Sequence, residues 1–113
     1  MHELAITQSM LDLVLGQAEK AEAKEVGRIN LVIGEMTGVV EDCVRFYFDF
    51  LSRGTIAEGA ALAIKAVPTT ARCRGCDKLF EVGESDWTCP HCSGNNIEVT
   101  AGKELFVESI EVE

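Results

Sequence analysis

The stretch CRGCDKLFEVGESDWTCPHC, residues 73–92, carries four of the chain's five cysteines as two Cys-x-x-Cys pairs. Each pair places two sulfurs on one tight turn, and the twelve residues between the pairs are enough for a hairpin that brings the turns together. Four thiolates around one ion leave no open coordination position. The spacing therefore predicts one tetrahedral metal ion bound by Cys73, Cys76, Cys89 and Cys92, and we expect this ion to be a structural zinc.

Two other chemistries fit the same sulfurs. The second pair, Cys89-Pro-His-Cys92, matches a strongly oxidising thiol-disulfide motif by letters, but that motif needs a helix N-terminus to stabilise its reactive thiolate. The residues that follow, 93–96, are turn formers and predict no helix. Iron could also occupy the four sulfurs, as in the rubredoxins, which the Cys-Pro-x-Cys turn followed by Gly94 resembles. Ligand type alone does not separate zinc from iron.

Length and composition limit the setting in which this site works. At 113 residues the chain fits one domain, or one domain with a small lobe. No apolar stretch is long enough to span a bilayer and the N-terminus lacks a secretion signal, so the cytoplasm is the expected location. In that reducing compartment five cysteines favour metal ligation over disulfides. The formal net charge of −9 would repel a phosphate backbone, which argues against nucleic acid as a partner.

Outside the cysteine-rich segment, the hydrophobic pattern predicts two helices and three strands. Helical spacing extends over residues 3 to about 23 and again over about 40–54, where Gly54 would supply a left-handed cap. Alternation predicts strands at 26–33, 61–67 and about 104–113. The apolar positions of the first helix are Ile6, Met10, Leu13, Val14 and Ala21.

The last of these strands has an irregular pattern. Its apolar positions switch face after Val107, so a β-bulge is expected near Glu108 and Ser109. Before it, between Pro68 and Gly102, the helical period disappears and turn formers dominate. This segment predicts a separate lobe inserted before the last strand, with strand-like pieces at 79–82 and 97–100 and a turn at 83–85.

The N-terminus offers a second set of metal donors. The chain begins Met1-His2-Glu3, and the bulky second residue predicts that Met1 remains the mature terminus. The α-amine, the His2 backbone nitrogen and the His2 imidazole can close fused chelate rings on one ion, and the Glu3 backbone nitrogen or carboxylate can complete the set. Nitrogen-rich sets of this kind suit square-planar Ni(II) or Cu(II). The alternative is that His2 and Glu3 only supply polarity at a helix start, where an acidic residue is favourable.

Short motifs spread over the whole chain share one family's pattern. They are Met1-His2-Glu3-Leu4, Ile33-Gly34-Glu35, Arg53-Gly54-Thr55, the two Cys-x-x-Cys turns, and Ser109-Ile110-Glu111-Val112-Glu113 at the end. Together they resemble the HypA family of nickel-insertion accessory proteins for [NiFe]-hydrogenase maturation. By this resemblance the fold is α+β, with a three-stranded mixed sheet, two helices on it, and an inserted zinc-ribbon-like lobe of short strands.

The resemblance also implies that two regions of the chain bind different metals. Residues 1–68 plus 102–113 would form a nickel-binding domain, and 69–101 a lobe with structural Zn(II). Exchangeable Ni(II) would bind at the Met1 amine, the His2 imidazole, and the backbone nitrogens of His2 and Glu3. Some relatives carry histidines directly after their Cys-x-x-Cys turns, whereas here His91 lies inside the second turn, so signalling through such histidines is in doubt for this chain.

The implied function is that of a nickel metallochaperone. The maturation GTPase HypB and the [NiFe]-hydrogenase large subunit would be its partners, the latter receiving the nickel. No enzyme activity is expected, because the sequence offers no Ser/His/Asp set, phosphate loop or open zinc ligand set. The alternative function is a zinc-ribbon protein-interaction module without metal transfer.

Overall fold

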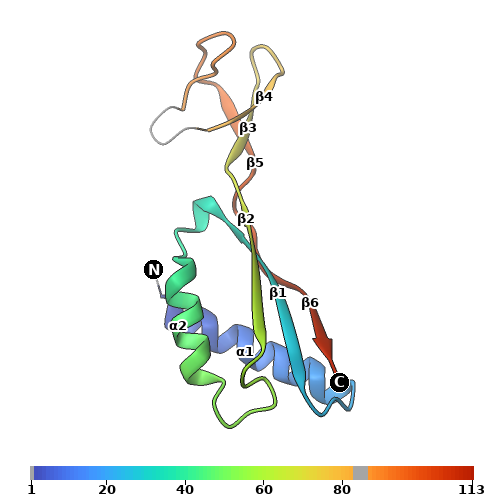
Figure 1. The fold of residues 1–113 in the computed structure, drawn as a ribbon. Coiled ribbons are helices and arrows are strands. Elements are labelled where there is room, and N and C mark those ends of the chain that lie inside the picture. The colour runs from blue at the N-terminus through green and yellow to red at the C-terminus, as the bar shows by residue number, and fades with distance from the viewer. Residues whose placement is uncertain (1, 83–86) are drawn as a thin grey trace.

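The computed structural model describes residues 2–82 and 87–113. Met1 and the turn expected at 83–85 lie outside the described residues. Two helices, α1 (Glu3–Lys20) and α2 (Glu41–Leu51), accompany two three-stranded sheets (Figure 1). The strands are β1 (Val26–Gly34), β2 (Ala61–Val67), β3 (Thr70–Cys73), β4 (Leu79–Glu81), β5 (Ile97–Ala101) and β6 (Leu105–Val112), and a short 3-10 helix, η1 (Glu35–Thr37), follows β1.

The first sheet has the order β2-β1-β6, with β1 parallel to β2 and antiparallel to β6. Parallel neighbours need a crossover, and α2 supplies it between β1 and β2. The fold class expected from the sequence is thereby confirmed. The bulge in β6 is confirmed as well: the register passes from Asn30 opposite Ser109 to Leu31 opposite Val107, which leaves Glu108 as the extra residue.

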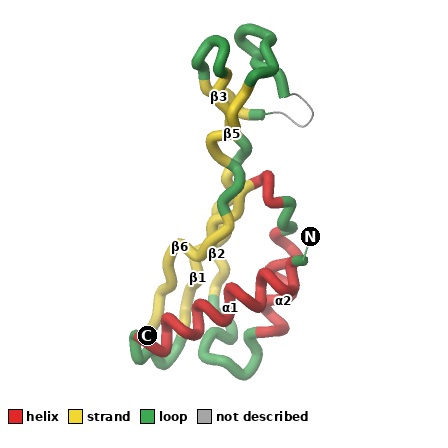
Figure 2. Tube along the Cα trace, turned by 180° about the vertical axis from the view of Figure 1, so that it is seen from behind, coloured by secondary structure: helices red, strands yellow, loops and turns green. Residues whose placement is uncertain are grey.

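Both helices cover one face of this sheet, and the apolar core lies between them and it (Figure 2). Helix α1, helix α2 and strand β1 all contribute side chains to this core, so residues far apart in the sequence exclude water together. The buried cluster consists of Met10, Leu11, Val14, Ala18, Val26, Ile29, Leu31, Val44, Phe48 and Ala57. We call the first sheet and its two helices the α/β domain.

The second sheet, of order β4-β3-β5, carries the four paired cysteines and extends from one end of the α/β domain (Figure 1). We call this region, β3 to β5, the cysteine lobe. The whole molecule is elongated, with extents of 55 × 24 × 17 Å. Two connections join its parts: β2 runs through Pro68 and Thr69 into β3, and β5 returns through Gly102 to β6.

The two connections meet the end of β1 in a tight junction. The Met36 amide donates to the Gly102 carbonyl at 2.8 Å, the Val82 amide donates to the Thr69 carbonyl at 2.9 Å, and Thr69 is buried. Gly34 allows this approach, since a Cβ there would collide with the Gly102 carbonyl. Gly102 itself has φ +118°, a conformation that L side chains rarely adopt.

Three details differ from the sequence-based predictions. Helix α1 ends at Lys20 rather than near residue 23, and α2 ends at Leu51. Gly54 does adopt a left-handed conformation (φ 79°), but in the turn after the helix. Strand β3 was not predicted, because four residues of alternating exposure, Thr70–Cys73, are too short to give a recognisable pattern.

The buried face of α1 is also different from the predicted one. Leu13 was assigned to the apolar face but is 53% exposed, whereas Leu11 is 2% exposed and Ala18 is fully buried. The apolar residues of this helix cover a wide arc, with Leu13 at one edge and Leu4 and Leu15 at the other, so their spacing does not define one narrow buried stripe. Packing against α2 and the sheet therefore decided which of them is buried.

Candidate metal centres

The two Cys-x-x-Cys turns fold in the same way. In the first, the Cys73 amide donates to the Lys78 carbonyl (3.0 Å) and the Asp77 amide donates to the Cys73 carbonyl (2.7 Å). In the second, the Cys89 amide donates to Gly94 and the Ser93 amide to Cys89, both at 2.8 Å. Each first cysteine thus closes its turn with the residues four and five positions on. The repeated cysteine spacing is a repeated backbone structure.

Each turn needs one residue in a left-handed conformation directly after its second cysteine. Asp77 has φ 61° and Ser93 has φ 62°. For residues other than glycine this conformation costs on the order of 1 kcal/mol, so bonds elsewhere in the turn must offset it. At Gly94 an added Cβ would lie 3.3 Å from the Cys92 sulfur. A glycine there lets the backbone approach that sulfur.

The turns face each other across the lobe and bring their sulfurs together. Cys73 Sγ lies 3.4 Å from Cys92 Sγ, and Cys76 Sγ lies 3.5 Å from Cys89 Sγ. All four sulfurs lie within 4.8 Å of one another. A tetrahedral ion with metal–sulfur bonds of about 2.3 Å requires sulfurs about 3.8 Å apart. The donor set therefore fits one tetrahedral ion.

Backbone amides and burial set the acidity of these thiols. The Cys76 amide, donating to the Cys73 sulfur, lowers the pKa of Cys73 to about 7. The Lys78 amide acts to lower the pKa of Cys76, but burial and the neighbouring thiols outweigh it and raise that pKa to about 12. The Gly94 amide likewise opposes a rise in the pKa of Cys92. Cys73 therefore loses its proton more readily than Cys76 and Cys92, and metal entry must displace the protons of those two thiols.

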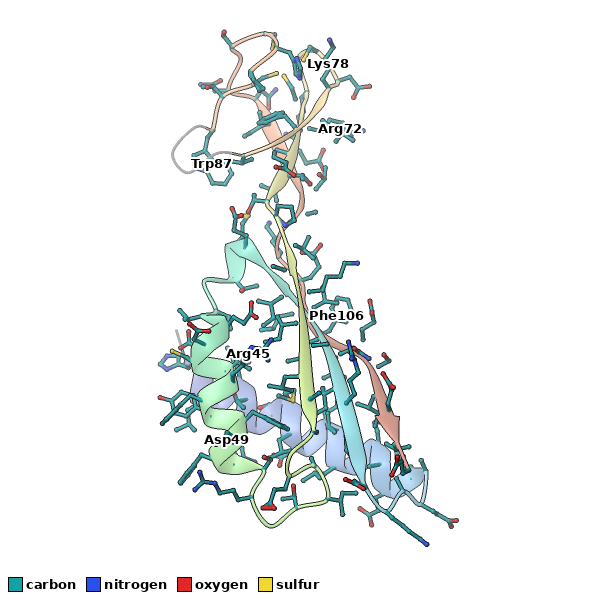
Figure 3. The ribbon with its side chains drawn as sticks, in the orientation of Figure 1. Arg45, Asp49, Arg72, Lys78, Trp87 and Phe106 are labelled. Carbon is teal, nitrogen blue, oxygen red and sulfur yellow. The ribbon has the colours of Figure 1, made fainter. Side chains whose placement is uncertain are left out.

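Basic side chains flank the first turn. Arg72 lies 3.4 Å from Glu98 and 3.6 Å from Asp77, and Arg74 lies 3.9 Å from Glu98. Figure 3 labels Arg72 and Lys78 on one side of the lobe, with Trp87 on the other. Both arginines are thus paired with carboxylates of the lobe.

The start of α1, which carries His2 and Glu3, lies in the α/β domain beside α2 and away from the lobe (Figure 1). His2 is exposed and forms the N-cap of α1, with its carbonyl accepting the Ile6 amide at 3.1 Å. Met1 lies outside the described residues. The structure therefore places two of the three predicted residues.

Glu3 makes a contact that sequence reasoning missed. Its side chain is buried, and its Oε2 accepts a hydrogen bond from the Val40 amide at 3.0 Å. Val40 is the N-cap of α2, so Glu3 fastens the start of α1 to the start of α2. This bond, first among its interactions, lowers the pKa of Glu3. No local sequence signal could reveal a partner 37 positions away.

Fold and sites together define a class: a small α+β protein with a closed four-thiolate centre in one part and an exposed N-terminal histidine in the other. Comparisons with known proteins specify it further. Residues 1–112 match the family model described as "Hydrogenase/urease nickel incorporation, metallochaperone, hypA". The chain belongs to this HypA family of nickel metallochaperones.

Relatives and solved structures agree with the assignment. The chain is 51% identical to hydrogenase maturation factor HypA of Dehalococcoides mccartyi, over all of this chain and 95% of the relative. It is 41% identical to hydrogenase maturation factor HybF of Escherichia coli O157:H7, over the full length of both. The solution structure of a HypA protein superposes with a TM-score of 0.73 at 24% identity, over all of this chain and 97% of that one. The solution structure of the nickel metallochaperone HypA from Helicobacter pylori, also 24% identical, superposes with a TM-score of 0.65 over 99% of this chain and 97% of that one.

Helices long and apolar enough to cross a membrane are absent from the described residues.

Proposed function

We propose that the chain carries two metals with different roles: a permanent structural zinc in the cysteine lobe and an exchangeable nickel at the N-terminus. The zinc assignment is supported by the sulfur spacing and by the closed set of four thiolates, which leaves no position for a substrate. The lobe, residues 69–101, would fold around this ion. Residues 1–68 with 102–113 would form the part that handles nickel.

For nickel, the donors would be the Met1 amine, the His2 imidazole, and the backbone nitrogens of His2 and Glu3. His2 is exposed at the start of α1, which supports this set. The Glu3 carboxylate already binds the Val40 amide, which favours the Glu3 backbone nitrogen over its carboxylate as donor. Deprotonated backbone nitrogens would also offset the charge of the Ni(II) ion, which is otherwise unfavourable at the positive end of the helix dipole.

Nickel is the cargo of this protein rather than its cofactor. Ni(II) would pass by ligand exchange to the [NiFe]-hydrogenase large subunit in the cytoplasm, with help from the GTPase HypB. The chain itself would catalyse no bond change. The single observation that carries the proposal is the exposed His2 at the open end of α1, in a family of nickel metallochaperones.

Nickel titration of untagged protein by calorimetry tests the site. His2→Ala should abolish binding of the nickel equivalent while zinc content and helical circular dichroism stay unchanged. The matched control is His91→Ala, which removes the chain's only other histidine. A Gly-Ser-Gly-Ser extension before Met1 should act like His2→Ala, because it moves the α-amine away from the His2 imidazole. Undiminished nickel binding in His2→Ala, or its loss in His91→Ala, would refute the assignment.

The alternative is a zinc-ribbon interaction module that transfers no metal. Exposed aromatic side chains favour it as a second candidate: Phe46 is 69% and Phe50 61% exposed on α2. It predicts one zinc per chain and no second metal equivalent at neutral pH. Elemental analysis of untagged protein before and after nickel addition separates the two functions.

A further inference from the structure

The two edges of the first sheet differ in how they are covered. At the β2 edge, Arg45 of α2 donates from its guanidinium to the Leu62 carbonyl at 2.8 Å, and Lys65 adds a charge to the same strand. Strand β6 forms the other edge, where Figures 1 and 2 both show it at the margin of the sheet. Within residues 2–82 and 87–113, no strand pairs with its outer side. An edge of this kind can accept another strand.

The pairing with β1 decides which backbone groups of β6 point outward. The Gly34 amide donates to the Glu104 carbonyl at 2.6 Å, and Val32 lies opposite Phe106, two positions along. Antiparallel residues bond to the partner strand at every second position. The backbone N–H and C=O groups of Phe106 therefore point toward β1, and those of Leu105 and Val107 point away from it. These groups form a short docking edge.

An apolar groove of about 560 Å³ adjoins this docking edge. It lies between the first half of α1 and the start of β6. Leu13 (53% exposed), Leu105 (43%) and Phe106 (50%) leave apolar surface open here. A strand added at the docking edge would alternate its side chains between this groove and the opposite face of the sheet. Main-chain bonds and side-chain pockets are the two components of β-strand addition.

The negative charge of β6 indicates which kind of strand could bind at the docking edge. Residues 104–113 contain Glu104, Glu108, Glu111 and Glu113 and no basic residue. Arg28 lies 3.5 Å from Glu111, at the end of the strand away from the docking edge. A second copy paired antiparallel through β6 would bring these carboxylates against one another, which is destabilising. A segment with lysines or arginines would meet opposite charges instead.

We propose that the outer edge of β6 at Leu105–Val107 binds an extended segment of a partner protein in which apolar residues alternate with Lys or Arg. The bulge at Glu108 interrupts the edge, so the added strand is short and the complex is transient. The proposal does not rest on nickel transfer, because none of its residues is a proposed metal ligand.

The probe is a synthetic eight-residue peptide of alternating valine and lysine, added to isotope-labelled protein. Amide signals of Leu105 and Val107 should shift and gain protection from hydrogen exchange. The matched peptide with glutamate in place of lysine should leave them unchanged. Absence of binding up to roughly 1 mM peptide, or shifts centred on α2 instead of β6, would overturn the proposal.

Two variants separate backbone pairing from ionic attraction. Leu105→Pro removes an outward N–H without removing a bond to β1. It should weaken binding of the valine–lysine peptide roughly threefold to tenfold more than Leu105→Ala does. Leu105→Ala is its control, since it loses the side chain and keeps the N–H. Equal binding by the two variants would refute strand addition. Unchanged melting and zinc content verify that both variants fold.

Charge is tested by a double reversal. Glu104→Lys with Glu108→Lys should weaken the lysine peptide at least about tenfold and admit the glutamate peptide. Glu19→Lys with Glu22→Lys, on the far end of α1, makes the same change in net charge and should have little effect. If both double variants lose binding equally, the peptide recognises net charge and not β6. A concentration-dependent dimer abolished by Leu105→Pro would identify a second copy as the occupant and overturn the proposed partner.

Discussion

The α/β domain and the cysteine lobe are stabilised by different means. The domain buries a contiguous apolar cluster shared by both helices and its sheet. Among the described residues of the lobe, only Ala71, Cys73, Val82 and Cys89 are buried, and two of these belong to the proposed zinc site. About thirty residues with so few buried side chains cannot offset their conformational entropy by apolar burial. The proposed zinc would supply the stability that the lobe lacks, whereas the domain has its own apolar core.

Metal removal should separate the two parts most clearly. Chelation, or Cys73→Ser, is expected to unfold the lobe, since structural zinc contributes on the order of 10 kcal/mol in zinc-finger peptides. Trp87, the chain's only tryptophan, lies in the lobe and both helices lie in the domain. Tryptophan fluorescence should therefore change while helical circular dichroism persists. Simultaneous loss of both signals would show that the domain depends on the metal too.

A cavity in the domain core should have the reverse effect. Ile29 is fully buried in the centre of β1, so Ile29→Ala should lower the free energy of unfolding of the domain by about 2–5 kcal/mol. Zinc content and Trp87 fluorescence should stay unchanged at temperatures below melting. Leu13→Ala, on the exposed side of α1, is the control and should cost less than about 0.5 kcal/mol. Loss of zinc from Ile29→Ala would contradict the independence of the two parts.

The two parts are least independent at the junction between them, because there they share hydrogen bonds. A Cβ at Gly34 would lie 2.7 Å from the Glu104 nitrogen as well as against Gly102, so Gly34→Ala should cost about 1–3 kcal/mol. It should also loosen the lobe and change the radius of gyration, which is 17.7 Å for the Cα atoms of the structure. X-ray scattering of the variant would detect this change. Gly27→Ala is the control, since its Cβ would make only an ordinary contact of 3.8 Å.

The smallest expected effect concerns Glu3, within the domain alone. Its pKa is lowered from about 4.5 on folding, so its contribution is complete above that pH and is lost as the pH falls through the folded value. In nickel-free protein, Glu3→Gln should therefore lower the melting temperature slightly at neutral pH. The difference should shrink in acid. A difference that stays constant with pH would show that the carboxylate charge is not what binds the Val40 amide.

Local patterns in the sequence were enough to predict several features. Alternation predicted β1 and β2, and the switch of apolar face after Val107 predicted the bulge at Glu108. Cysteine spacing predicted that four sulfurs would converge. Each of these depends on residues a few positions apart, or on a ligand set that one ion can satisfy. Such information is present before the chain folds.

What the sequence by itself determined is therefore the helices and strands of the α/β domain and the meeting of the two cysteine turns. Only the tertiary structure decided that Leu11 rather than Leu13 is buried, that Glu3 binds the Val40 amide, and that Gly34 lies against Gly102. The physical reason is the separation along the sequence over which each kind of interaction acts. Hydrophobic periodicity and ligand spacing act within short segments, but packing and buried hydrogen bonds depend on which distant surfaces exclude water together.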